Sequence, residues 1–283
     1  MKTYLDCYPC FLRQALDAAR FAGASDEQQA RVLQDTLEIL QTVTPDMTPP
    51  TVGDKIHRHV RELVNHNDPY AEVKQRATER AQHLLPQVRE MIRKADDPFE
   101  QAVRMAIAGN IIDFGPGSSY DLSGALAEVT QRPLIADGLE ALRHALDRHR
   151  SMLYIGDNAG ETVFDRALIE VLDVDVTYVT KGAPVLNDAT LDDAKAAGLH
   201  EVAHLITTGS DAPGTILARA STEFRRAYDQ ARVIIAKGQA NYETLSPGDE
   251  RLFFLLKAKC PVIARDLGVE TGSLVVKQGQ ARG

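Results

Sequence analysis

Residues 152–161, which read Met-Leu-Tyr-Ile-Gly-Asp-Asn-Ala-Gly-Glu, decide the fold class of this chain. The first four have the length and apolar character of a buried β-strand. A glycine-containing turn and then a helical pattern follow them, which is the order of a βαβ unit. We therefore expect a mostly parallel sheet with Asp157 and Asn158 at the carboxyl end of one strand.

Further apolar runs of strand length, each followed by a turn and a helical pattern, predict additional strands of this sheet. They cover residues 174–180, 202–207, 233–236 and 252–256, with residues 273–276 as a candidate edge strand. Four or five parallel strands are expected. The fold class is therefore α/β, with a mostly parallel sheet flanked by helices.

The chain before this sheet has only helical patterns. Ser25 and Gln28 form a capping box in front of a helix, and Ile56 and Val60 share one face of another. We divide the chain into a helical N-terminal region at residues 1–108 and an α/β domain at residues 109–283. The helical region would act as a cap or as a dimerising layer, so a homo-oligomer is a candidate assembly.

Composition excludes several classes of function. The chain has 283 residues, a formal net charge of -8, 44% hydrophobic and 25% charged residues. Its lysines and arginines are scattered among acids, so the positive field that nucleic-acid binding needs is missing. No apolar stretch reaches the length of a membrane helix. We expect a cytoplasmic protein with neither nucleic acid nor membrane as a partner.

Polar residues gather directly after the predicted strands, where ligands bind in open α/β sheets. Carboxylate and amide oxygens suit Mg²⁺ or Mn²⁺, while lysines and turn N–H groups suit phosphate oxygens. A metal there would lower the pKa of a bound water and polarise a phosphoryl group. The candidate residues are Asp157, Asn158, Glu161, Lys181, Gly182, Asp188, Asp211, Lys237 and Gly238.

Each candidate also has a purely structural interpretation. Asn158 with Glu161 three positions later fits a helix cap. Asp188 is less open to this doubt, because Thr190 and Asp193 already supply a cap. Asp211 fits a turn former better than a ligand. The two lysines, at 181 and 237, could simply be solvated, although each is followed by glycine after a strand.

Two further groups lie outside this sheet edge. Asn110 and Asp113 sit at the join between the two regions, where they either bond locally or reach the substrate. Cys7, Cys10 and Cys260 are an odd number of cysteines, which indicates a reducing compartment. They form a candidate second metal site only if the fold brings Cys260 to the other two, with His57 or Asp6 as a fourth ligand.

Five motifs in order resemble the damage-control phosphatase family, long catalogued as domain of unknown function 89, in its prokaryotic branch with an N-terminal Cys-x-x-Cys. They begin at Asp6, Gly109, Gly156, Lys181 and Lys237 and span almost the whole chain. The resemblance implies a Rossmann-like, metal-dependent phosphatase of sugar phosphates and damaged phospho-metabolites, with Mg²⁺, Mn²⁺, Co²⁺ or Ni²⁺ as the metal.

The resemblance also implies roles for single residues. It gives Asp157, Asn158 and Asp188 as catalytic metal ligands and Lys237 as the catalytic lysine on the phosphate side. Residue 239 is Gln, where many relatives are expected to carry an acid, so substrate contacts at that position are open.

Competing enzyme classes lack their motifs here. The strand at 152–155 is followed neither by Asp-x-Asp, as a haloacid-dehalogenase phosphatase requires, nor by Gly-x-Gly-x-x-Gly. No Gly-x-x-x-x-Gly-Lys-Ser/Thr loop occurs. The alternative that stays open is a non-catalytic sensor that binds a phosphorylated ligand through the same metal and lysines.

Overall fold

The structure is a computed structural model that describes residues 1–280 except residue 45, residues 110–131 and residue 247. The described helices are α1 (Cys7–Phe21), α2 (Asp26–Gln41), α3 (Pro49–Val64), α4 (Ala71–Lys94), α5 (Pro98–Ala108), α7 (Leu139–His149), α8 (Thr162–Ile169), α9 (Leu191–Ala196), α10 (Thr222–Gln230), α11 (Gly238–Leu245) and α12 (Pro261–Leu267). The described strands are β1 (Leu134–Ile135), β2 (Ser151–Ile155), β3 (Asp175–Thr180), β4 (His204–Thr207), β5 (Ile234–Lys237), β6 (Leu252–Lys257) and β7 (Leu274–Gln278).

The described strands form one sheet in the order β1-β7-β6-β5-β2-β3-β4. Strands β2 to β6 are all parallel, and Ile155 pairs with both Val179 and Ala236. From β2 the chain adds β3 and β4 on one side of the sheet and then returns to add β5 and β6 on the other side of β2. The order of the strands therefore reverses between β2 and β5. The carboxyl ends of these two strands therefore border the crevice in which ligands of such sheets bind.

The predicted α/β class with a mostly parallel sheet is confirmed, with one correction at its border. Strand β7 runs antiparallel to β6 and is covered on its outer side by β1. Residues 273–276 are therefore not at the edge. The two-residue strand β1 was missed because so short a segment has no readable periodicity.

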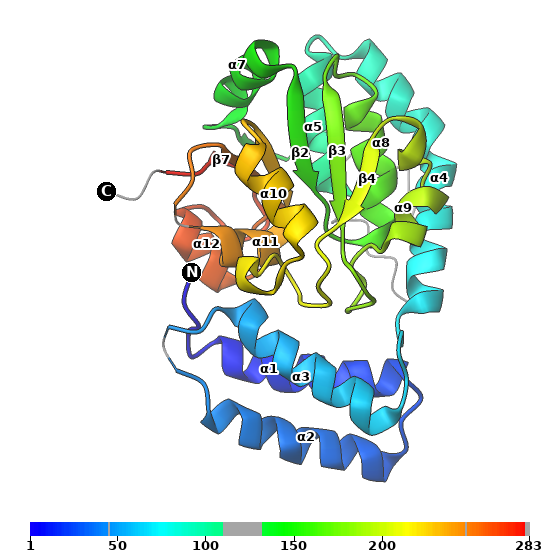
Figure 1. Cartoon of the computed structure of the whole chain (residues 1–283), viewed down its shortest axis with the longest axis vertical. Helices are drawn as coiled ribbons and strands as arrows, with labels where there is room; N and C mark the ends of the chain where they lie inside the picture. Colours follow the sequence, from blue (N-terminus) through cyan, green and yellow to red (C-terminus); the bar gives the residue numbers. More distant parts are fainter. Residues whose placement is uncertain (45, 110–131, 247, 281–283) are drawn as a thin grey trace.

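Helices cover both faces of the sheet, and alternate strand residues serve the two faces. Tyr154, Tyr178 and Phe253 belong to the core with α4, α5, α7 and α8. Leu153 and Phe254, their neighbours in sequence, belong to the core with α10, α11 and α12. Figure 1 shows these helix layers on either side of the strands. Because both faces are buried, the strands read as continuous apolar runs.

The first three helices form a separate layer with its own core, which includes Phe11, Val32 and Ile56. The predicted capping box of Ser25 and Gln28 is present at the start of α2. Figure 1 shows this layer, hereafter the cap, at the end of the molecule toward which β2 and β3 point.

Helices α4 and α5 differ from the cap in what they pack on, since their buried residues belong to the sheet core. The change from helices to strands near residue 108 therefore does not coincide with the border between the two cores, which falls between α3 and α4. Helical periodicity shows that a face is buried but does not identify its partner.

Candidate active site

The loops after β2 and β3 are joined to each other by their backbones. Asn158 and Asp188 form an isolated antiparallel bridge. The Ala159 N–H donates to Asn187 O at 2.9 Å, and the Ala189 N–H donates to Asp157 O at 2.8 Å. This pairing brings the predicted metal ligands Asp157, Asn158 and Asp188 together at one edge of the sheet.

The predicted helix cap next to Asp188 is also present. Thr190 N–H and Oγ1 both donate to Asp193 Oδ2, at 2.8 and 2.6 Å. Asp188 is therefore not needed for capping. Asn158 does not cap either, because its Nδ2 donates to Glu161 Oε1 at 2.7 Å and to Asp157 Oδ2 at 3.3 Å. Its amide oxygen is the atom that is left for a ligand.

The two carboxylates are buried close to each other. Asp157 is 7% exposed and Asp188 is 4% exposed. Burial and, secondarily, the charge of Asp188 raise the pKa of Asp157 to about 6, against the opposing charges of Lys259 and Lys181. Burial also raises the pKa of Asp188, again against Lys181. Two buried carboxylates of this kind are stabilised when a cation joins them.

The site fits a hard divalent cation. Lys181 Nζ lies 3.3 Å from Asp188 Oδ2, yet among the described residues this buried oxygen accepts no hydrogen bond of normal geometry. Gly238 has a φ of +77°, and a Cβ there would collide with the Asp157 carboxylate. Two carboxylates and one amide oxygen, with no side chain at 238 to crowd them, are a donor set that Mg²⁺ or Mn²⁺ accepts.

Lys237 does not face this site. Its Nζ is 1% exposed and donates to Ala106 O at 2.8 Å, Glu161 Oε2 at 3.1 Å and Asp165 Oδ1 at 2.6 Å. Burial would lower its pKa, but Asp165 and Glu161 outweigh burial and raise it. All three of its donors are used inside the protein. In this structure the Lys237 side chain points into the sheet core, and its predicted contact with a phosphate stays a prediction.

Lys181 and Gly182 are also committed to the protein. The Lys181 ammonium donates to Gly214 O and faces Asp188, with 3% exposure. The Gly182 N–H donates to Ser210 O at 2.9 Å, and a Cβ at Gly182 would lie 2.6 Å from the carbonyl carbon of Gly209. These contacts show that a Lys-Gly pair after a strand also suits the close approach of two loops, and the predicted role of both residues in substrate binding stays a prediction.

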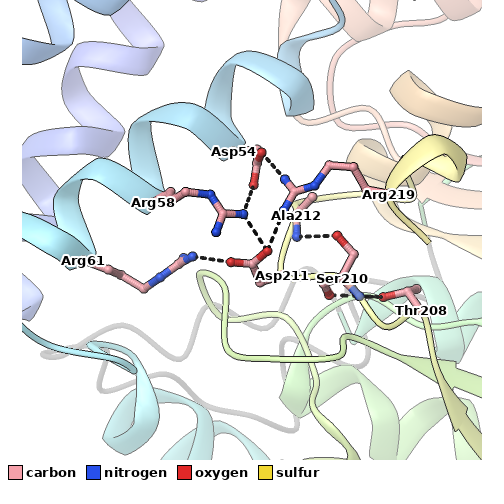
Figure 2. A network of polar contacts seen from close by, with 8 residues as sticks. All are labelled: Asp54, Arg58, Arg61, Thr208, Ser210, Asp211, Ala212 and Arg219. Atoms are coloured by element: carbon pink, nitrogen blue, oxygen red, sulfur yellow. Dashed lines mark hydrogen bonds and ion pairs between the residues drawn. The ribbon is translucent and has the colours of Figure 1, made fainter. Parts of the chain in front are cut away.

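Asp211 was predicted as a substrate residue and instead anchors the cap (Figure 2). Its carboxylate accepts from Arg58 and Arg61 at 2.7 Å and from Arg219 at 2.8 Å. Asp54 completes this group through Arg58 and Arg219. Burial would raise the pKa of Asp211, but Arg58 outweighs it and lowers the pKa. The turn after β4 thus joins α3, a partner that spacing in the sequence cannot show.

A cavity of about 390 Å³ lies between the cap and the metal-binding loops. Its wall on the cap side includes Phe11, Pro49 and Gly53. Its floor includes Asp157, Asn158 and Asp188, the three predicted metal ligands. The volume is in the range of small-molecule sites, roughly 300–1,000 Å³.

Lys259 and Glu243 also line this cavity, and neither of them was predicted from the sequence. Lys259 is exposed, follows β6, and its charge lowers the pKa of Asp157 and of Asp188. The rule that residues directly after a predicted strand are site candidates would have identified Lys259, because the predicted strand ends at residue 256. Glu243 is one helical turn after Gln239 on α11, a position that no strand-end rule reaches.

The three cysteines do line the same cavity, so the fold brings Cys260 to the side of Cys7 and Cys10. All three thiols are free. Within the described part of the chain, however, no group of three or more His, Cys, Asp and Glu side chains is arranged to hold a metal ion. His57, proposed as a fourth ligand, is buried at a different cavity beside Val60. Asn110 and Asp113 lie outside the described residues.

Comparison with known proteins identifies the family of this chain. A family model described as the damage-control phosphatase ARMT1-like domain matches residues 3–275. The chain belongs to this family. A damage-control phosphatase of Pyrococcus horikoshii is 36% identical over 97% of this chain and 97% of its own length. One of Archaeoglobus fulgidus is 34% identical over 96% of this chain and 97% of its own length.

One further relative and a crystal structure of the Pyrococcus horikoshii protein just named also match the chain. An uncharacterised protein of Methanocaldococcus jannaschii is 39% identical, over 96% of this chain and 93% of its own length. The crystal structure of a DUF89 family protein from Pyrococcus horikoshii has a TM-score of 0.89 at 36% identity, covering 99% of this chain and all of that one. Family membership supports phosphatase activity for this damage-control phosphatase homologue. No helix within the described ranges has both the length and the apolar character to span a bilayer.

Proposed function

We propose that this chain is a metal-dependent phosphatase that hydrolyses small phosphomonoesters, with a divalent cation bound by Asp157, Asn158 and Asp188. One observation carries the proposal: the oxygens of these residues, from two backbone-paired loops, form the floor of a cavity of about 390 Å³. Membership of a phosphatase family gives the reaction type. The cavity volume favours small metabolites, such as sugar phosphates, over macromolecules.

A bound divalent cation would polarise the phosphoryl group and lower the pKa of a bound water. The chain supplies the rest. Lys259 presents its ammonium at the cavity and is suited to attract the dianionic phosphate. The cap closes the opposite side with Phe11 and Pro49, which reduces the access of water and strengthens charge interactions inside.

The test is phosphate release from a panel of sugar phosphates and nucleotides, with Mg²⁺, Mn²⁺, Co²⁺ or Ni²⁺ and after removal of metal by EDTA. We expect turnover that EDTA abolishes and added metal restores. Binding of a phosphorylated ligand without turnover under any of these metals would instead make the protein a sensor.

Variants of the predicted metal ligands Asp157 and Asp188 distinguish loss of metal binding from loss of folding. Asp157→Asn and Asp188→Asn should each lower kcat/KM by about 10³-fold or more, since metal ligands are needed for the chemical step. Asp157→Asn removes a buried charge, so its metal-free form should unfold at no lower temperature than the wild type. Asp188→Asn also removes the carboxylate paired with the buried Lys181, so its metal-free form should unfold at a lower temperature. Mn²⁺ should raise the Tm of the wild type and leave that of the variants unchanged.

The matched control is Asp147→Asn, which changes an exposed carboxylate on α7 at the other end of the sheet. Its rate and its Tm response to Mn²⁺ should equal those of the wild type. Wild-type rates in both Asp157→Asn and Asp188→Asn would disprove the metal site.

A further inference from the structure

Glu243 is a buried carboxyl group in the wall of the cavity that neither the metal site nor the lysines account for. It is 6% exposed and lies on α11, whose first residue, Gly238, touches the Asp157 carboxylate. Its Oε1 accepts a hydrogen bond from Gln239 Nε2 at 3.0 Å. Among the described residues, no lysine or arginine forms an ion pair with it. The group is thus oriented by a neutral donor and faces the substrate space.

Burial favours the protonated form of Glu243. Together with the smaller effects of the Asp157 and Asp266 charges, burial raises the pKa of Glu243 to about 7, against the Gln239 hydrogen bond and the amino group of Met1. The thiols of Cys7 and Cys10, on α1, line the same cavity; burial raises their pKa, and the charge of Glu243 adds to the rise. Glu243 therefore exchanges a proton near neutral pH, as a general acid requires.

The proposed reaction creates a need for such an acid. Hydrolysis of a sugar phosphate expels an alkoxide, which is a poor leaving group unless a proton reaches it as the P–O bond breaks. Asp157 and Asp188 cannot supply the proton if they bind the cation, and Lys259 is suited to hold the phosphate. Glu243 is the remaining buried acid of the cavity wall.

We infer that Glu243 is the general acid of this phosphatase and protonates the leaving alcohol oxygen, with Gln239 as its positioning residue. The inference rests on the proposed function. A water oxygen forms the new bond to phosphorus, and the bond from phosphorus to the ester oxygen breaks. The proton of Glu243 passes to that ester oxygen and gives the alcohol. The proton released by the attacking water restores the acid, so the net reaction is ester plus water to alcohol plus phosphate.

The experiment compares two leaving groups on Glu243→Gln. A hexose phosphate needs a proton on its leaving oxygen, whereas p-nitrophenyl phosphate releases a stable phenolate and does not. We expect the hexose phosphate rate to fall by about 10²-fold or more and the p-nitrophenyl phosphate rate to change less than about threefold. Glu243→Asp should restore part of the hexose phosphate rate, and Glu250→Gln, at an exposed glutamate, should change neither rate.

A pH profile gives a second readout. For the wild type on the hexose phosphate, kcat should fall as pH rises through about 7, because Glu243 loses its proton. Glu243→Gln should lack this descending limb. Equal losses on both substrates, or no loss on either, would overturn the role of Glu243. If the wild type hydrolyses neither substrate with any metal, the proposed function fails first and this inference fails with it.

Discussion

Two ionic networks in this molecule use the same chemistry in different surroundings. The inner network, under the metal-binding loops, joins Lys237 to Glu161 and Asp165, and each of these side chains is at most 1% exposed. The outer network, between the cap and the turn after β4, joins the aspartates 54 and 211 to three arginines, with side chains that are 12% to 41% exposed. Figure 2 shows the outer network.

The difference in burial assigns the two networks different tasks. In the inner one, the hydroxyl groups of Tyr154 and Tyr178 also donate to Asp165, both at 2.7 Å, and Glu161 accepts from Asn158. Every member is held by several partners in a low dielectric, so it can fix the position of a metal ligand. The outer network is partly solvated, and its contribution is weaker and screened by salt. It determines where the cap rests.

The largest expected effect is on Lys237→Met. Removal of the lysine leaves Glu161 and Asp165 as buried carboxylates with only neutral hydrogen-bond donors and no cation, so the free energy of unfolding should fall by about 3–5 kcal/mol. Urea unfolding measured by circular dichroism gives this value. An unchanged stability together with a large rise in KM for phosphate esters would show that Lys237 reaches the substrate after all.

The second prediction tests how much the hydrogen bond from Tyr178 to Asp165 contributes to stability. Tyr178→Phe removes one hydrogen bond to the charged Asp165 and should lower the free energy of unfolding by about 1.5–3 kcal/mol. Urea unfolding again measures the loss. Tyr8→Phe, on the partly exposed α1, is the matched control and should change stability by less than about 0.5 kcal/mol. If the two losses are equal, the inner network is not cooperative.

The third effect concerns the outer network. Asp211→Asn should lower the free energy of unfolding by only about 1 kcal/mol, because the ion pairs are partly solvated. The same change should raise KM severalfold, since the cap forms one wall of the cavity. Repeating the unfolding in high salt should shrink the difference from the wild type. A loss as large as that of Lys237→Met would mean that burial does not separate the two networks.

The smallest effect is the pH dependence of the difference in unfolding free energy between the wild type and Asp211→Asn. The pKa of Asp211 is lowered from its ordinary value of 3.8 in the folded protein, with Arg58 as the main cause of the lowering. Its stabilisation is therefore complete above pH 3.8 and is lost as pH falls through the lower, folded pKa. Unfolding of wild type and Asp211→Asn between pH 7 and pH 3 should give curves that converge only at the acid end.

The sequence predicted four or five parallel strands and the convergence of Asp157, Asn158 and Asp188 at one sheet edge, because both depend on local order. An apolar run followed by a glycine turn indicates a strand end, and parallel strand ends meet at one edge. The direction of the lysine side chains was not predictable in this way. Lys237 and Lys181 follow or end strands as expected, but their partners Ala106 and Gly214 are 131 and 33 residues away. Pairing over such distances is decided by packing.

Lys259 and Glu243 were missed for two different physical reasons. Lys259 obeys the strand-end rule and required only that the rule be applied to the last parallel strand. Glu243 lies in mid-helix, where a glutamate is by default a solvated side chain. Its burial depends on the cap covering α11, and that covering depends on contacts between α3 and α11 that no local pattern contains.

The separate core of the cap has a consequence for the diversity of such enzymes. One wall of the cavity belongs to the cap, which has its own apolar core, while the loops that are proposed to hold the ion pack with the sheet. Substitutions at Pro49 or Gly53 can reshape this wall of the cavity while leaving the sequence of the proposed ion-binding loops unchanged. A library randomised at these positions alone is the direct route to new substrate selectivity in this scaffold.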